Sequence, residues 1–231
     1  MRILLMSATK AEIEPFLRHF QSVRTSVLTQ ETYHLKIDQF LITAVISGPG
    51  MMNMAFHTAM ALFQQPFQIA IQAGIAGSFS KDITLGEVVQ VTSEQIADLG
   101  AEDNDKFIPI SQMPFFHPNE YPYQNGILYN QTQPELNLPE TGLLKKVKGI
   151  TVNTVSGNSK TIELRQNLFH PDVETMEGAS FFYACLKNHS IPFSQIRSIS
   201  NYIEPRNTDN WKIPLAIESL NGFLIHLFGP K

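Results

Sequence analysis

The chain has 231 residues, of which 43% are hydrophobic and only 16% are charged. This length suits one large domain, and the apolar content, with 16 phenylalanines, excludes a disordered chain. The net charge of -4 offers no basic surface for nucleic acid, and the single cysteine excludes an intramolecular disulfide and cysteine-rich zinc sites. Typical domains carry about 25% charged residues. The low charge therefore indicates additional buried surface, either a subunit interface or an enclosed pocket.

The first part of the sequence alternates short apolar strands with apolar helices. The pattern predicts strands at residues 3–6, 33–37, 40–46, 69–71 and 88–96, and helices at 11–20 and 51–63. In the helix at 11–20 the apolar residues recur at helical spacing, whereas the strand at 88–96 alternates. The apolar run at 3–6 is too short for a signal-peptide core or a membrane span, so we expect a cytoplasmic protein.

Residues 97–138 lack any such pattern. The stretch is rich in asparagine, glutamine, proline and aromatic residues, and four prolines between 109 and 122 disfavour a continuous helix or a central strand. Irregular stretches of this length inside a domain are usually functional or mobile. The basic cluster that follows, Lys145, Lys146 and Lys148, is expected in a solvated loop.

The last third of the chain again alternates strands and helices. The pattern predicts strands at 150–155, 173–176 and 195–202, and helices at 161–169, 178–186 and 215–228, the last with Pro214 in its first turn. Because the strands are apolar on both faces, helices should cover the sheet on both sides. No repeat or linker-like segment divides the chain. We therefore predict one α/β domain over residues 1–231.

Two glycine-rich segments follow predicted strands. Ser-Gly-Pro-Gly at 47–50 lacks the third glycine of a dinucleotide-binding motif, so a turn that packs a helix against the sheet is favoured. Ala-Gly-Ile-Ala-Gly-Ser at 73–78 is expected as a loop at the carboxyl edge of the sheet, where ligands of open α/β sheets bind. For this second segment a structural turn and a pocket wall that includes Ile75 are equally open.

Three polar side chains are predicted at this same edge. Glu12 follows the first strand near a helix start, and its ordinary interpretation is a surface or capping carboxylate. Glu177 has apolar neighbours at another helix start, so we expect it to be partly buried with partners; a structural ion pair is the alternative. Asn201 ends the strand at 195–202, where its amide suits a ligand that both donates and accepts, or simply a turn.

No motif in the sequence indicates a metal site or covalent catalysis. None of the seven histidines is paired with another histidine or with cysteine at metal-ligand spacing, so we predict no metal site. The sequence has no Gly-x-Ser-x-Gly motif, no Walker loop and no kinase signature. Cys185 lies in an apolar helix and is expected to be inert core.

The order of the motifs resembles the purine nucleoside phosphorylase and nucleosidase superfamily over almost the whole chain. The motifs are Glu12, Ala-Gly-Ile-Ala-Gly-Ser at 73–78, Leu-Gly-Glu-Val-Val at 85–89, Met-Glu-Gly-Ala at 176–179 and Arg-Ser-Ile-Ser-Asn at 197–201. Because the sequence lacks phosphate-site arginines, it is similar to the hydrolytic branch of this superfamily, which is typified by methylthioadenosine nucleosidase. Residues 151–157 and 200–207 are similar to the futalosine hydrolases, which release hypoxanthine from futalosine on an alternative bacterial route to menaquinone.

The resemblance implies a twisted mixed central sheet and a role for each flagged residue. Glu12 would be the general base that activates the attacking water. Glu177 would hold the ribose hydroxyls and stabilise the cationic sugar, and Met176 and Ile75 would line the substrate pocket. Asn201 stands where adenine-specific relatives carry an aspartate. Because an amide can hydrogen-bond N7 and O6 of a 6-oxopurine, hypoxanthine is favoured over adenine as the leaving group.

The far end of the substrate has two candidate partners in the sequence. Futalosine carries a benzoate, for which Arg206 and Lys160 are candidates by their loop positions. Adenine-specific relatives place an aromatic residue after the Ser-Gly at 156–157, where this chain has Asn-Ser-Lys. Stacking on the base would then come from the aromatic loop, at Phe107 or at 115–116.

Two other functions fit the same residues. One is a nucleosidase for methylthioadenosine or adenosylhomocysteine, against which Asn201 argues. The other is a non-catalytic module that binds purine nucleosides, against which the retained Glu12 and Glu177 argue. In each case we expect no metal or other cofactor, a nucleoside as the small-molecule partner, and no nucleic acid or membrane. We also expect a homodimer, formed partly by the methionine-rich helix at 51–63.

Overall fold

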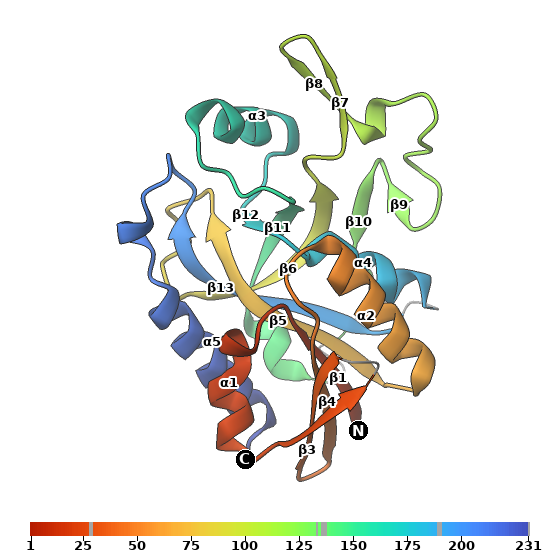
Figure 1. The fold of residues 1–231 in the computed structure, drawn as a ribbon, viewed down its shortest axis with the longest axis vertical. Coiled ribbons are helices and arrows are strands. Elements are labelled where there is room, and N and C mark those ends of the chain that lie inside the picture. Colours follow the sequence, from red (N-terminus) through yellow and green to blue (C-terminus); the bar gives the residue numbers. More distant parts are fainter. Residues whose placement is uncertain (28–29, 133, 135–137, 189–190, 231) are drawn as a thin grey trace.

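One large twisted sheet runs through the computed structural model, which describes residues 1–27, 30–132, 134, 138–188 and 191–230 (Figure 1). A separate two-stranded hairpin lies beyond one end of the sheet. The strands of the sheet are β1 (Arg2–Ser7), β2 (Val23–Val27), β3 (Gln30–Ile37), β4 (Phe40–Ile46), β5 (Ile69–Ser78), β6 (Val88–Ile96), β9 (Tyr123–Gln124), β10 (Ile127–Tyr129), β11 (Lys145–Thr151), β12 (Val173–Thr175) and β13 (Phe193–Tyr202). The hairpin is formed by β7 (Gly100–Asp103) and β8 (Lys106–Pro109).

The strand pairing is mixed and closes partly on itself. The order along the sheet is β2-β3-β4-β1-β5-β12-β11-β6-β10-β9, and β13 pairs with both β5 and β6. The strands β5, β13, β6, β11 and β12 therefore form a ring. Strand β1 runs parallel to β4 and β5, whereas β13 is parallel to β5 and antiparallel to β6. These pairings confirm the predicted α/β class with a mixed central sheet.

Helices cover both faces of the sheet, because alternate residues of its inner strands are apolar on each face. Ile3 and Leu5 of β1 belong to a core formed with α1 (Lys10–His19) and α5 (Ile213–Phe228). Leu4 and Met6 belong to a second core formed with α2 (Met51–Gln64) and α4 (Gly178–Lys187). Figure 1 shows α1 beside α5 and α2 beside α4. Each such apolar side chain contributes roughly 1.5–3 kcal/mol when fully buried.

The remaining long helix, α3 (Ser159–Phe169), follows β11. Its N-cap is Asn158, whose side-chain oxygen accepts a hydrogen bond from the Thr161 N–H at 2.9 Å. The helix ends at Phe169, and the next residue, His170, has the left-handed φ of 46° that stops helical hydrogen bonding. No helix within the described residues has the length and apolar character needed to cross a membrane.

The loop predicted at 73–78 is wrong, because these residues continue β5 as far as Ser78. The two glycines of this segment serve close packing instead of a turn. A Cβ on Gly74 would lie 2.3 Å from Nη1 of Arg197, and one on Gly77 would lie 2.4 Å from Cδ1 of Ile203. Glycine inside a strand marks such a close approach.

The strand predicted at 150–155 is also misplaced, since β11 ends at Thr151 and begins at Lys145. The basic cluster therefore lies in a strand of the sheet, and its prediction as a loop is wrong. Lys146 and Lys148 are exposed and alternate with the buried Val147 and Gly149. This half-buried pattern hid the strand, because lysine is uncommon in strand interiors.

Residues 97–138 are irregular only in part. Strand β10 joins the edge of the sheet by pairing antiparallel with β6, and β9 pairs with β10. The five prolines of this stretch lie outside β9 and β10, which is why this short edge pair can form. Residues 133 and 135–137 of the predicted irregular stretch lie outside the described residues.

Candidate active site

The carboxyl ends of the parallel strands β4, β1, β5 and β13 meet at one edge of the sheet. Because these strands run in the same direction, the segments that follow them converge. Glu12 arrives on the helix after β1, and Gly50 lies in the turn after β4. Ile75 and Arg197 come from β5 and β13 themselves. Glu177 completes the group from the start of α4.

Glu12 is buried and held in one orientation, with 7% of its surface exposed. Its Oε2 accepts hydrogen bonds from the Thr9 N–H at 2.9 Å, the Thr9 hydroxyl at 3.1 Å and the Ser7 hydroxyl at 3.2 Å. This is a capping box at the start of α1, so the capping interpretation is correct for one oxygen. The other oxygen, Oε1, accepts the Ile75 N–H at 3.1 Å. The helix cap therefore directs the carboxylate toward β5.

Glu177 is buried as predicted and has partners from two distant segments. Its Oε1 accepts the Gly50 N–H at 2.9 Å, and its Oε2 lies 3.7 Å from Nη2 of Arg197. Burial raises the pKa of Glu177 above its usual value, and nearby Glu12 adds to the rise, while Arg197 and the Gly50 N–H oppose it. The ion pair foreseen as an alternative therefore exists, but it is long.

Arg197 lies between the two carboxylates and was not singled out from the sequence. Its side chain is 1% exposed, and its Nη1 donates to the Ile75 carbonyl at 3.5 Å. Among the described residues, its Nε and Nη2 have no hydrogen-bond partner. A Cβ on Gly74 would also lie 2.7 Å from Oε1 of Glu12, so this glycine leaves the space that both charged groups occupy. An arginine in the middle of a predicted strand was the available signal.

A third buried carboxyl group, Glu94 of β6, lies behind this arginine. Burial raises its pKa to about 7, against hydrogen bonds from Gln195 and Thr151 and the charge of Arg197, which lower it. Glu177 adds a further rise. Glu94 was not among the residues predicted from the sequence, although a carboxylate on the buried face of an alternating strand was a possible signal.

Asn201 lies in β13, where the strand pairing with β5 is interrupted by a bulge between Ile199 and Asn201. A bulge re-aims the side chains around it. The Asn201 Oδ1 accepts the Ser200 hydroxyl at 2.8 Å, and its Nδ2 donates to the Tyr202 carbonyl at 3.1 Å. A Cβ on Gly77 would lie 3.2 Å from Nδ2, so Asn201 lies directly against the glycine segment of β5.

The other predicted pocket residues divide into near and far positions. Ile75 binds Glu12 through its backbone N–H, and Met176 immediately precedes Glu177 in the chain. Arg206 is exposed in a separate loop, where its backbone N–H donates to the Gly157 carbonyl at 3.0 Å. Its guanidinium carbon lies 5.1 Å from the centroid of the Trp211 ring.

The candidates for stacking and benzoate binding lie in different surroundings. Lys160 is exposed in the first turn of α3. Phe107 is half-buried in β8, and Phe115 is 70% exposed. Phe116 packs edge-on against Tyr123, with ring centroids 5.1 Å apart.

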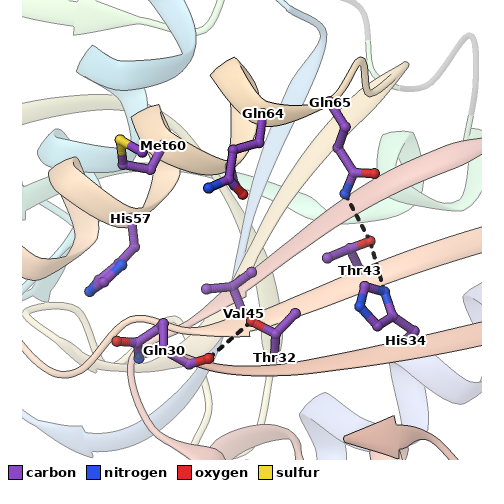
Figure 2. A pocket seen from close by; sticks show the side chains of 10 residues that line it. Gln30, Thr32, His34, Thr43, Val45, His57, Met60, Gln64 and Gln65 are labelled. Carbon is purple, nitrogen blue, oxygen red and sulfur yellow. Dashed lines mark hydrogen bonds between the residues drawn. The ribbon is translucent and has the colours of Figure 1, made fainter. Parts of the chain in front are cut away.

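A small polar pocket lies between α2 and the strands β3 and β4, apart from the carboxylates (Figure 2). Its volume is about 50 Å³, too small for a nucleoside. Figure 2 shows Gln65 donating to the Thr43 hydroxyl, which also contacts His34. Burial lowers the pKa of His57 on its other wall. This pocket is therefore not the candidate active site.

Two buried carboxylates, an arginine between them and an amide at the sheet edge can act together on a ligand with positive character. Carboxylates stabilise a developing cation, and the amide can bind a polar ring edge. A mixed sheet with helices on both faces and such a cluster defines a protein of the nucleoside phosphorylase and nucleosidase type. The model of the Phosphorylase superfamily matches residues 2–227, so the chain belongs to this superfamily.

Comparison with individual proteins agrees with this family. The chain is 28% identical to a futalosine hydrolase from Streptomyces coelicolor over 228 residues, which cover 95% of this chain and 92% of the relative. A futalosine hydrolase mutant structure from Helicobacter pylori aligns with a TM-score of 0.80 at 17% identity, covering 98% of each chain.

A methylthioadenosine/adenosylhomocysteine nucleosidase from Colwellia psychrerythraea, solved with adenine, aligns with a TM-score of 0.82 at 16% identity. It covers 99% of this chain and 94% of the other. The structural alignments show the shared fold. The resemblance to the superfamily, and within it to the futalosine hydrolases, is confirmed.

Proposed function

We propose that the protein is an N-glycosyl hydrolase that cleaves futalosine into hypoxanthine and dehypoxanthine futalosine. The observation that carries the proposal is the buried cluster in which Glu12 and Glu177 lie on either side of Arg197, at the same sheet edge as Asn201. Curated relatives over most of the chain are futalosine hydrolases, which supports this substrate.

The cluster suits the charge changes of this hydrolysis. The bond between the sugar C1′ and the purine nitrogen breaks, and its electron pair leaves with the purine. Glu12 takes a proton from water as the water oxygen bonds to C1′, and that proton ends, overall, on the released base. Glu177 holds the ribose hydroxyls and stabilises the positive charge on the sugar. General-base and electrostatic effects of this kind each accelerate a reaction by about 10²–10⁴-fold.

The choice of base is assigned to Asn201. Its amide can donate to N7 or O6 of a 6-oxopurine once it leaves its bond to the Tyr202 carbonyl. Met176 and Ile75 line the ribose side of the pocket. Arg206, exposed and stacked on Trp211, is the cation assigned to the benzoate of futalosine. No metal or cofactor takes part in these steps.

The test is incubation of the purified protein with futalosine, inosine and methylthioadenosine, each with and without phosphate. We expect hypoxanthine from futalosine at a rate that phosphate does not change. Adenine from methylthioadenosine at a higher rate would assign the adenine-nucleosidase function. Release only with phosphate would assign phosphorolysis, and no base from any substrate would favour a binding module.

Two further assignments accompany this function. The futalosine activity would place the protein on the futalosine route to menaquinone, in the cytoplasm. We also propose a homodimer that buries the exposed side of α2, where Met52, Phe56 and Phe63 are 85%, 55% and 85% exposed. The molar mass of the protein in solution, measured by light scattering as it elutes from a size-exclusion column, tests the dimer. The mass of a monomer would contradict it.

A further inference from the structure

Glu177 begins α4 without capping it. A helix usually uses the side chain of its N-cap residue to accept from the first free N–H groups. Glu177 occupies the N-cap position, but its side chain makes no such bond and reaches Gly50 instead. Other groups must therefore satisfy the first turn of α4, or the carboxylate would be drawn back to its own helix.

Two threonine hydroxyls take over the capping. The Gly178 N–H donates to the Thr175 hydroxyl oxygen at 3.1 Å, and the Ala179 N–H donates to that of Thr151 at 2.7 Å. Thr151 belongs to β11, so this cap ties the helix to the sheet. A hydroxyl can accept from the helix only when its own proton points elsewhere.

Glu94 sets that orientation. The Thr151 hydroxyl donates to Oε2 of Glu94 at 2.9 Å, and the Gln195 amide donates to Oε1 at 2.9 Å. The Glu94 carboxyl group is fully buried. With its proton directed to Glu94, the Thr151 oxygen presents its lone pairs to Ala179.

Glycine positions show that the close contact of Glu94 with α4 is built into the sequence. A Cβ on Gly178, the residue after Glu177, would lie 1.9 Å from Oε1 of Glu94. A Cβ on Gly149 would lie 2.5 Å from the same oxygen. Both positions therefore have to lack a side chain for this carboxyl group to lie against the start of α4.

Glu94 also reaches the partner of Glu177. Gln195 and Arg197 are two residues apart in β13, so their side chains lie on the same face. The bond from Gln195 to Glu94 thus orders the residues beside Arg197. Glu94 therefore contacts both the cap of the helix that begins at Glu177 and a side chain that neighbours Arg197 in β13.

We propose that Glu94 is a positioning residue for Glu177, acting through the Thr151 cap of α4 and through Gln195 beside Arg197. Glu94 is fully buried and acts through Thr151 and Gln195. Its effect is to leave the Glu177 carboxylate free to face the sheet edge. This inference rests on the proposed function only for the reaction that Glu177 serves.

The test compares variants that break the chain of contacts with variants that keep it. Glu94→Leu and Thr151→Val remove the bond while keeping similar volume. Glu94→Gln and Thr151→Ser are the rescuing partners. The side-chain oxygen Oε1 of Gln195 has no hydrogen-bond partner among the described residues. The Gln195 side-chain amide can therefore flip, so that Oε1 accepts from the new side-chain amide of Glu94→Gln.

Gln90→Met is the matched control. Gln90 is 2% exposed and donates to the Ser194 hydroxyl at 3.1 Å. It pairs with Ile196, which packs in the α5 core, so it lies on the opposite face of the sheet from Glu94. Its loss removes one buried hydrogen bond far from α4.

We expect Glu94→Leu and Thr151→Val to lower kcat by about 10- to 100-fold with KM changed roughly threefold or less, as for a displaced catalytic group. Glu94→Gln, Thr151→Ser and Gln90→Met should keep kcat within about threefold. If Glu94→Leu does not fold, Thr151→Val and Thr151→Ser decide alone. An equal fall of kcat in Gln90→Met, or unchanged kcat in Thr151→Val, would overturn the proposal.

Hydrogen exchange without substrate separates this inference from the proposed function. Peptides that cover 178–187 should exchange faster in Glu94→Leu and Thr151→Val than in the wild type, the rescuing variants or Gln90→Met. Should the wild type release no base from any nucleoside, the proposed function fails, while exchange still tests the positioning. Unchanged exchange in both disruptive variants would overturn it.

Discussion

Within the part of the chain that the structure describes, two buried pairs of arginine and glutamate differ in how fully they are satisfied. Glu174 accepts the Ser156 N–H at 2.7 Å, the Ser156 hydroxyl at 2.6 Å and Nη1 of Arg165 at 3.0 Å. Arg165 also donates to the Thr154 carbonyl at 3.0 Å. In the other pair, Arg197 and Glu177 are 3.7 Å apart.

The second pair keeps unused hydrogen-bonding capacity. Nε and Nη2 of Arg197 have no hydrogen-bond partner among the described residues. A buried polar group without a partner is costly, so such groups mark places where a ligand or water completes the set. The saturated pair fixes the loop at 152–158 as structure. The unsaturated pair is the one that the proposed function assigns to the substrate.

Removing each carboxylate tests this difference most strongly. We expect Glu177→Gln to lower kcat for futalosine by about 10³–10⁴-fold, since the charge that stabilises the cationic sugar is lost. Glu174→Gln should keep kcat within about tenfold, because Glu174 holds only the loop. Steady-state rates of hypoxanthine release give both values. Comparable losses in the two variants would remove the distinction between the pairs.

Stability should respond in the opposite order. Glu174→Ala leaves Arg165 buried without its carboxylate, so we expect the free energy of unfolding to fall by about 3–5 kcal/mol. Glu177→Gln keeps the bond from Gly50 and leaves the Glu12 carboxylate beside Arg197, so it should cost only about 1 kcal/mol. Urea denaturation followed by circular dichroism measures both. A larger loss in Glu177→Gln would show that its pair is the structural one.

The buried carboxyl group of Glu94 should make the stability of the protein depend on pH. Burial raises the pKa of Glu94 to about 7, from its usual value of 4.5. A raised pKa means that the folded state binds more protons, so the stabilisation is present below about pH 4.5 and is lost as pH rises through about 7. Between pH 5 and pH 8, we expect the free energy of unfolding of the wild type to fall by about 2–3 kcal/mol more than that of Glu94→Gln.

Urea unfolding of both proteins at these two pH values checks this. The uncharged amide of Glu94→Gln cannot titrate, so this variant removes the contribution of one group while the rest of the protein titrates as before. Parallel pH profiles for the two proteins would contradict a titrating Glu94. In that case the cluster around Glu177 would lose no more stability at alkaline pH than the saturated pair of Arg165 and Glu174.

The smallest effect is expected at the rim, where Arg206 is exposed. Arg206→Ala should raise KM for futalosine by about tenfold and leave KM for inosine nearly unchanged, because only futalosine carries a benzoate. Lys160→Ala is the matched control for the other candidate cation. Equal changes for both substrates would show that Arg206 does not bind the benzoate.

The α-helices and most inner strands could be read from the sequence, whereas β2 and the short strands β7 to β10 could not. Three of the residues that the structure brings to the sheet edge could also be singled out. The strand at 88–96 and the helix that begins at residue 51 follow from local apolar spacing. Glu177 could be singled out as a carboxylate at a helix start with apolar neighbours. Glu12 and Asn201 could be placed beside a helix start and at a strand end, but only the family resemblance implied a role for them. Such signals lie within a few residues along the chain, where periodicity and helix starts are visible.

Arg197, Glu94 and the extent of β5 were decided only by the tertiary structure. Arg197 is placed beside Glu12 and Glu177 by the pairing of β13 with β5. Glu94 meets the start of α4 because β6 and β11 are neighbours and two glycines leave room. Glycines that allow close packing look like loop glycines until the opposing side chain is known. The sequence by itself determined which groups could do the chemistry, and the sheet pairing decided which of them meet, since contacts between distant strands leave no local pattern.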